Sequence, residues 1–246
     1  GNPAMMPGSS YSADGTGYFY NMAGAGGGGG SIGGLTLTGP VTLNQDVTIT
    51  SENADVIING TVSGGGTHSL SLTADSLTAN AFDNLAELNV NLSKDSAING
   101  IISGTATSFV KQGECNLALT AANSFNGSTL VSGGTLTVSQ SQIFDNTDPD
   151  NPVVIGNYTG ALGDLGNPFV LTGATLAMSD IALTLYDLTM DGQSAITSIG
   201  TTALTLPDAM PTVGGVEGAP TAFTLGGSIE TLGAFDVNAP ITLSGN

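Results

Sequence analysis

The feature of this sequence that most constrains its fold is a recurring pattern of short strands separated by glycine corners. From residue 35 onward, Leu, Val and Ile recur at every second position, with Thr, Ser or Asn between them. A period of two is typical of a β-strand with one buried face. Runs of this kind occupy residues 35–38, 41–43, 47–50, 56–58 and 70–73. Asn-Gly and Gly-Gly pairs such as Asn59-Gly60 and Gly133-Gly134 separate these runs, so we expect strands and tight corners with almost no helix.

Internal similarity decides how such strands are arranged. Many short strands fit either an antiparallel sandwich or barrel, or a parallel solenoid of stacked coils. Residues 56–64 (VIINGTVSG) are echoed by residues 96–104 (SAINGIISG), and residues 133–138 (GGTLTV) by residues 173–178 (GATLAM). Repeated units that each bury their core against the next unit favour the solenoid. We therefore predict an all-β fold in which residues 35–246 form a parallel β-helix, or β-solenoid.

The first 34 residues differ from the rest of the chain. They combine an aromatic cluster, Tyr18, Phe19 and Tyr20, with a glycine-rich run at residues 24–30. Glycine loses the most entropy on ordering, so this run cannot hold a regular element. We expect residues 1–34 to be a Gly-rich arm, which is either a flexible terminus or a segment that docks on a neighbouring subunit.

The charge balance excludes several classes of partner. The chain has 20 acidic residues against two lysines, Lys94 and Lys111, and its net charge is -18. It therefore cannot neutralise a row of phosphates, which excludes nucleic acid and anionic membranes as partners. Its apolar runs are too short for a transmembrane segment. The acidity and the abundance of Ser, Thr, Asn and Gly lead us to expect a secreted or cell-surface protein.

One part of the body resembles a known family. It contains NGIISG at residues 99–104, Lys111 and Gly113 followed by LAL at 117–119, an Asn-Ser-Phe at 123–125, and GGTLTV at 133–138. Residues 96–138 thereby resemble the autotransporter-associated β-strand repeat, and residues 35–92 resemble coils of filamentous-haemagglutinin-type surface proteins. The chain departs from the repeat at residues 114–116 and in a polar insertion at residues 140–151. The resemblance implies a right-handed parallel β-helix on a bacterial surface that serves as passenger, adhesin or scaffold, and it carries over no catalytic residue.

The polar insertion holds the densest group of oxygen ligands. Asp145, Asp148 and Asp150 lie within seven residues that also include two Asn. Ca²⁺ takes six to eight oxygens from such side chains, so these three are a candidate calcium site. The glycine and the distal Glu of an EF-hand are missing, and Asp, Asn and Pro also serve ordinary turns. A solvated loop that needs no cofactor is the alternative.

Other reactive side chains are few. Cys115 would need His68, the one histidine, as a base, and the pair cannot make a zinc site. Paired carboxylates leave one enzymatic alternative, a β-helix that degrades polysaccharides. Its candidate acids are Asp75, Asp83, Asp180, Asp187 and Asp191. With no Arg and no Trp to build a sugar-cleaving cleft, we expect a non-enzymatic protein.

These observations lead to two functional hypotheses. In the first, the protein is a structural subunit that assembles head-to-tail into a fimbria-like homopolymer, because solenoid ends present unpaired strand edges. Residues 237–245 are similar to residues 37–43, so the last coil is expected to match the first coil of the next copy. The expected interface residues are Tyr18, Phe19, Tyr20, Ile241 and Leu243. In the second hypothesis, the chain is a monomeric adhesin or passenger that binds glycans or matrix.

Overall fold

The computed structural model describes most of the predicted body and little of the predicted arm. Side chains are described for residues 34–51, 53–125, 127–139, 168–185, 187–200, 202–208, 221 and 223–243, and the backbone alone for residues 11–13, 142–145 and 153–157. Every element in these ranges is a strand. Tyr18, Phe19 and Tyr20 lie outside the described residues, and so does most of the 1–34 segment.

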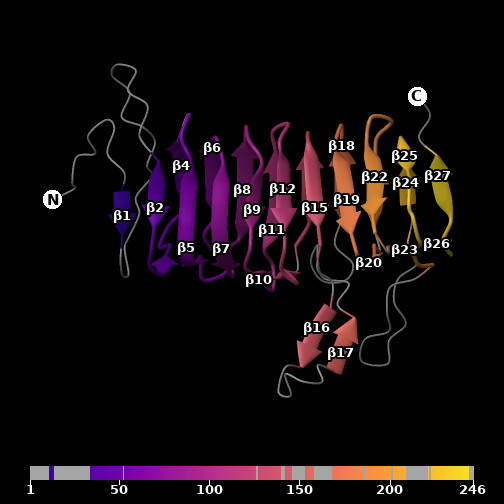
Figure 1. Ribbon diagram of the computed structural model, residues 1–246, viewed down its shortest axis with the longest axis horizontal. Helices are drawn as coiled ribbons and strands as arrows, with labels where there is room; N and C mark the ends of the chain where they lie inside the picture. The colour runs from indigo at the N-terminus through magenta and orange to yellow at the C-terminus, as the bar shows by residue number, and fades with distance from the viewer. Residues whose placement is uncertain are drawn as a thin grey trace.

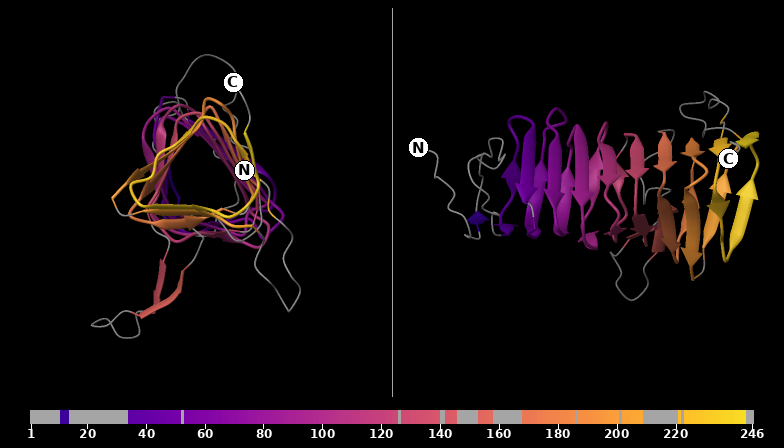
Figure 2. Two further views of the ribbon diagram at one scale, coloured as in Figure 1. Left: turned by 90° about the vertical axis from the view of Figure 1, so that its right-hand side faces the viewer. Right: turned by 90° about the horizontal axis from the view of Figure 1, so that it is seen from above.

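The described strands form a parallel β-solenoid, which confirms the predicted fold class (Figure 1). The strands run across the long axis of the molecule and stack along it, with the N-terminal coils at one end and the C-terminal coils at the other. Seen along that axis, each coil is a rounded triangle with a strand on each side (Figure 2). The right-handed sense of the coil stays a prediction.

Thirteen strands form the larger sheet. Its continuous ladder consists of β1 (Tyr11–Ala13), β2 (Leu35–Leu37), β5 (Val56–Ser63), β7 (Leu77–Asp83), β9 (Ser96–Ile98), β12 (Asn116–Leu119), β15 (Thr135–Val138), β19 (Thr175–Ser179), β22 (Ala195–Ile199) and β25 (Ser228–Ile229). Within the predicted arm, β1 pairs in parallel with β2 of the same chain.

Nine strands form the second side of the solenoid. They are β4 (Val47–Ser51), β6 (Leu70–Ala74), β8 (Glu87–Leu92), β11 (Ser108–Gln112), β14 (Thr129–Ser132), β18 (Phe169–Thr172), β21 (Leu188–Met190), β24 (Phe223–Leu225) and β27 (Ile241–Leu243). Each coil ends with one of these strands and then turns into the next strand of the larger sheet. We call these turns the closing corner.

The third side is interrupted partway along the molecule. Its first part consists of β3 (Val41–Thr42), the ends of β5 and β7, β10 (Ile102–Gly104) and β13 (Ser124–Phe125), and its second part of β20 (Ala182–Thr184), β23 (Ala203–Leu206) and β26 (Ala234–Val237). The coil between them carries an antiparallel hairpin, β16 (Gln142–Asp145) and β17 (Val153–Asn157), which lies outside the triangular body (Figures 1 and 2). A hairpin thus begins inside the stretch predicted as a polar loop.

In-register stacking of coils explains why the alternating pattern produces a core. In β6, Leu70, Leu72 and Ala74 point inward and are buried, whereas Ser71 and Thr73 between them point outward. Leu70 pairs with Leu88 and Leu88 with Phe109, so these coils repeat every 18 to 21 residues. The core is shared between sides, since the rings of Phe109 in β11 and Phe125 in β13 lie 6.0 Å apart.

Polar side chains form ladders on the outside of the same coils. The Thr120 hydroxyl donates to the Asn99 amide oxygen at 3.2 Å, and the Thr137 hydroxyl donates to the Asn116 amide oxygen at 2.7 Å. Each bond joins residues 21 positions apart. Outward polar residues therefore add to the backbone pairing between coils.

The closing corner requires glycine where successive turns touch. Gly134 has φ +62°, and a Cβ there would press against the carbonyl of Cys115 in the preceding coil. That carbonyl accepts the Thr135 amide at 3.1 Å and cannot move away without weakening this bond. By contrast Gly65, with φ +60°, faces open space.

We therefore expect Gly134→Ala to destabilise the solenoid more than Gly65→Ala. Both variants incur the cost of a left-handed backbone for a residue with a Cβ, about 1–2 kcal/mol. Only Gly134→Ala adds a clash with the backbone of the neighbouring coil. Urea unfolding followed by far-UV circular dichroism measures both losses, and equal midpoints for the two variants would contradict the close stacking at this corner.

Candidate functional site

Carboxylates at the closing corner bind the next coil. Asp55 accepts a hydrogen bond from the Ser76 hydroxyl at 2.7 Å, and Asp75 accepts one from the Ser93 hydroxyl at 2.7 Å. One coil further, Asp95 accepts the backbone amide of Asn116 at 3.0 Å. Each acid thus joins its own turn to the one stacked on it, and the corner is fixed by side chains as well as by the backbone.

Both lysines of the chain lie at or beside this corner. The Lys94 ammonium is 2.6 Å from Asp75 and remains mostly exposed. Its hydrogen bond, with that of the Ser93 hydroxyl, lowers the pKa of Asp75 below its ordinary value, and the Asp75 carboxylate raises the pKa of Lys94. Asp75 is therefore an ionised carboxylate in a local ion pair.

Lys111 differs from Lys94 because it is fully buried. It takes an inward position of β11, in register between Val90 and Val131 of the neighbouring strands. Its ammonium donates to the carbonyls of Gly113 at 2.7 Å and Gly133 at 2.9 Å, which belong to two successive turns of the closing corner. Burial lowers the pKa of Lys111, while the nearby Cys115 and Glu114 act in the opposite direction. Lys111 is thus an internal clamp between two coils.

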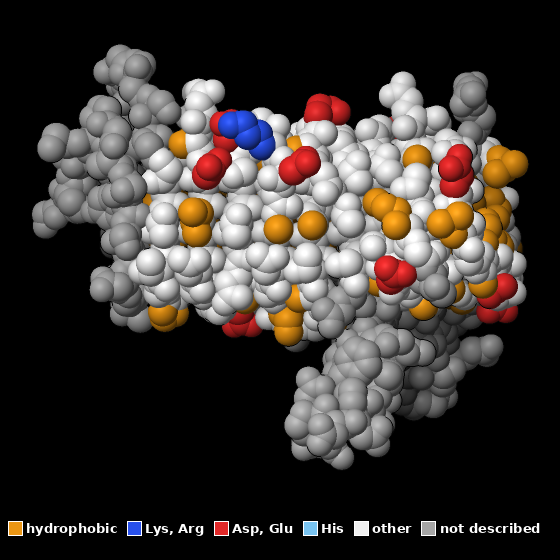
Figure 3. Space-filling model, viewed as in Figure 1, with side chains coloured by type: hydrophobic (Ala, Val, Ile, Leu, Met, Phe, Trp, Pro, Cys, Tyr) orange, Lys and Arg blue, Asp and Glu red, His pale blue; other side chains and the backbone are white. Residues whose placement is uncertain are grey.

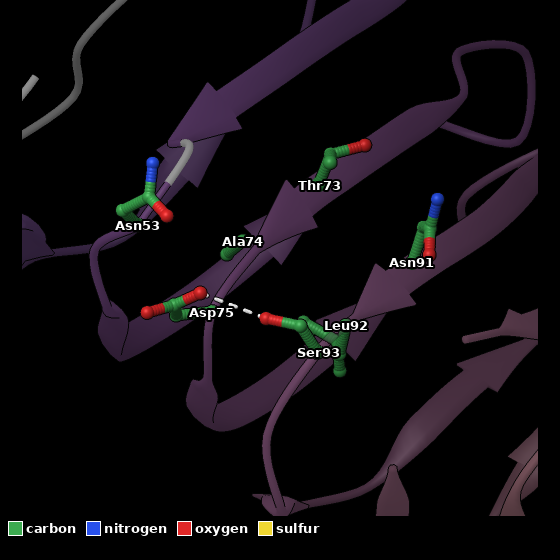
Figure 4. A pocket seen from close by; sticks show the side chains of 7 residues that line it. All are labelled: Asn53, Thr73, Ala74, Asp75, Asn91, Leu92 and Ser93. Atoms are coloured by element: carbon green, nitrogen blue, oxygen red, sulfur yellow. Dashed lines mark hydrogen bonds between the residues drawn. The ribbon is translucent and has the colours of Figure 1, made fainter. Parts of the chain in front are cut away.

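A groove of about 300 Å³ opens at the same corner, beside the first three coils. Its lining comes from the ends of β6 and β8 and from the turns that follow β4, β6 and β8. The lining residues are Asn53, Thr73, Ala74, Asp75, Asn91, Leu92 and Ser93. In the close-up, the side chains of Thr73 and Asn91 stand out from adjacent strands, and those of Asp75 and Ser93 point toward each other (Figure 4).

The acids considered for an enzyme do not converge. Asp180, Asp187 and Asp191 belong to three different corners of a single coil, since they follow β19, precede β21 and follow β21. Asp75 bonds Ser93 and Lys94, and Asp83 accepts the hydroxyls of Ser63 and Ser103 from the coils on either side. Asp191 accepts the Ser194 hydroxyl and the Gly173 amide, which lower its pKa. The described contacts of Asp75, Asp83 and Asp191 thus serve the stacking.

Cys115 and His68 lie at different corners. His68 is in the turn between β5 and β6, and its backbone amide donates to Gly64. Cys115 is buried at the closing corner, where burial raises the pKa of its thiol and Lys111 opposes that shift. The structure therefore does not join them as nucleophile and base.

The predicted calcium residues are not tested. Asp148 and Asp150 lie outside the described residues, and Asp145 ends β16, of which only the backbone is described. Within the ranges that carry side chains, no group of three or more His, Cys, Asp or Glu residues could hold a metal ion. The described part of the chain likewise contains no helix able to span a membrane.

The two predicted interface residues that are described lie at the C-terminal end. Ile241 and Leu243 belong to β27, and their exposed fractions are 38% and 79%. The segments that were expected to match lie on different sides of the solenoid. Val41 pairs with Val62 on the third side, whereas Ile241 pairs with Phe223 in the nine-stranded sheet. The sequence similarity between the two segments therefore does not superpose one end of the solenoid on the other.

Comparison with known proteins gives a distant similarity. Over 151 residues the chain is 29% identical to the protein named adhesin BmaC autotransporter of Brucella suis biovar 1 (strain 1330). The match covers 61% of this chain and 4% of that protein, so the chain spans only a small part of its relative. No family model and no solved structure matches the chain.

The two lysines provide a matched test of the internal clamp. We expect Lys111→Met to destabilise the fold by about 1–3 kcal/mol, because two partly buried carbonyls lose their charged donor. Lys94→Met removes an exposed ion pair and should leave the melting temperature nearly unchanged. Thermal unfolding of both variants checks this, and a Lys111→Met protein as stable as Lys94→Met would refute the clamp.

Acid should weaken the carboxylate contacts between coils. The pKa values of Asp75 and Asp191 lie below the ordinary 3.8. Stability from these groups is therefore present above that value and is lost as the pH falls through the lower, folded-state pKa. We expect Asp191→Asn to lower the melting temperature at pH 7 and to have little effect near pH 2. The exposed Asp236→Asn is the control, and a pH-independent effect of Asp191→Asn would contradict the assignment.

Proposed function

We propose that this chain is a non-enzymatic segment of a bacterial surface adhesin, in which the solenoid is a rigid rod that displays uncharged polar surface and inserted segments. The similarity to an autotransporter adhesin supports this role and a cell-surface location. So does the exterior, where the face seen in Figure 3 is mainly uncharged, with acidic side chains at only a few places. Such a surface suits partners that offer hydroxyls and amides, namely glycans or matrix.

The observation that carries the proposal is the use of acidic residues between coils. A glycoside hydrolase needs two carboxylates that converge on one bond. Here Asp55, Asp75 and Asp95 each bond the following coil. Their spacing along the rod follows the coil repeat, which supports a structural role for them.

Attachment of displayed protein tests the adhesin role. The chain would be displayed on a non-adherent bacterium, and bound cells counted on epithelial monolayers and on extracellular matrix. We expect more attachment than with an unrelated β-solenoid of similar length displayed at the same density. Attachment no greater than this control would contradict the adhesin, and release of reducing sugar ends from polysaccharides by the purified chain would contradict a non-enzymatic role.

A second candidate function, head-to-tail assembly, is favoured by the C-terminal end of the solenoid. Phe235, Ile241 and Leu243 are exposed there, with Leu243 at 79%. Hydrophobic side chains gather at this end of the space-filling view (Figure 3). In the described part of the chain, no strand covers the outer edges of β25, β26 and β27. Parallel edges beside apolar side chains pair readily with a further strand, which in this second candidate belongs to another copy.

Two isoleucines of equal exposure test this assembly. Ile241 in the last coil and Ile57 in β5 are both 38% exposed. We expect Ile241→Asp to reduce the particle mass measured by light scattering at rising protein concentration, because it places a charge in the joint. Ile57→Asp should assemble like the parent chain. A parent chain that stays monomeric at every concentration would overturn the filament and leave the monomeric adhesin.

A further inference from the structure

The groove at the closing corner combines polar side chains with apolar ones. Thr73 and Asn91 are register partners on β6 and β8, so a hydroxyl and an amide stand side by side at its wall. Ala74 and Leu92, the next register pair, are mostly buried and contribute the apolar part of the lining. A sugar ring presents the same combination, with hydroxyls at its rim and C–H groups on its faces.

The carboxylate in the groove can accept further hydrogen bonds. Asp75 accepts the Ser93 hydroxyl through Oδ1 and the Lys94 ammonium through Oδ2. An ionised carboxylate accepts about four hydrogen bonds, so each oxygen retains capacity for one more donor. Two neighbouring hydroxyls of one ligand match that capacity. The amides of Asn53 and Asn91 donate as well as accept, which suits ligand hydroxyls that do the same.

The charge of the groove favours an uncharged ligand. Lys94 lies 2.6 Å from Asp75, so the carboxylate that lines the groove belongs to an ion pair. The chain as a whole carries -18, which repels acidic sugars over several ångströms. A cationic ligand at Asp75 would be repelled by the Lys94 ammonium. Neutral sugars avoid both costs.

The groove is held in place before any ligand binds. The Lys94 amide donates to the Asp75 carbonyl at 2.7 Å, and the Asp75 amide donates to the Ala54 carbonyl at 3.1 Å. These bonds tie the turns of three successive coils together. A site whose groups are already fixed loses little entropy on binding. Its volume of about 300 Å³ is at the lower end of ligand sites, which suits one or two sugar units.

We infer that this groove is a binding site for neutral saccharide units, with Asp75, Asn91 and Thr73 contacting ligand hydroxyls. The inference rests on the proposed adhesin function for its biological meaning, but the groove is tested separately. It assigns recognition to a specific corner of the rod, distinct from the hairpin and from the C-terminal end.

NMR titration of the isotope-labelled chain tests the site directly. The probes are the methyl glycosides of glucose, galactose, mannose and N-acetylglucosamine at millimolar concentrations, with N-acetylneuraminic acid as the acidic counterpart. We expect at least one neutral glycoside to shift amide signals at residues 73–75 and 91–94. Asn91→Ala and Thr73→Ala should each weaken that binding about tenfold, as expected for loss of a hydrogen bond.

Asn89→Ala is the matched control, since Asn89 lies on the same strand two residues before Asn91 and does not line the groove. Unchanged amide spectra away from the substituted site show that each variant is folded. The inference is overturned if no neutral glycoside shifts the groove signals, if Asn89→Ala weakens binding as much as Asn91→Ala, or if the acidic sugar binds equally well. If no glycoside binds the groove but cells that display the chain still attach, the saccharide site is wrong and the adhesin role is not contradicted.

Discussion

Parallel pairing of each coil with the next, in one register, is the constraint on which the rest of this structure depends. It places residues about 20 positions apart in direct contact, so that the apolar half of every alternating strand reaches a common core. A shift of one residue in any strand would turn its apolar side chains outward. This register also fixes the contacts of Gly134, of the buried Lys111 and of the acids at the closing corner, because their partners belong to neighbouring coils.

Both lysines of this cation-poor chain make contacts between neighbouring coils. One lysine neutralises Asp75 beside the groove, and the other is enclosed between Val90 and Val131 with its ammonium on two corner carbonyls. The carboxylates that the coil repeat stacks at one corner, Asp55, Asp75 and Asp95, are hydrogen-bonded to hydroxyls and amides of the following coil. The face of the rod seen in Figure 3 is mainly uncharged, although the chain as a whole is strongly acidic.

The sequence was sufficient to predict the solenoid but not which side each strand joins. The similar segments 56–64 and 96–104 do lie on the same side of the solenoid, since Ile58, Ala79 and Ile98 follow one another along the larger sheet. The similarity between residues 37–43 and 237–245 is misleading. Strands on all three sides have the same period of two, so such a similarity does not show which side a strand joins. The groove and the Lys111 clamp could not be predicted, since the bonds of Asp75 to Ser93 and Lys94 and that of Lys111 to Gly133 each span about one coil and depend on the register.

Distances between spin labels measure that register most directly. Ser71 in β6 and Thr189 in β21 point outward and lie in one register row of the nine-stranded sheet, which runs Ser71, Asn89, Val110, Leu130, Val170 and Thr189. Cysteines at these two positions, in a Cys115→Ser background, would be labelled for pulsed electron spin resonance. Five steps of about 4.8 Å predict backbone positions about 24 Å apart, with a narrow distribution. A broad distribution, or a separation beyond 40 Å after allowing for the label arms, would contradict the continuous stack.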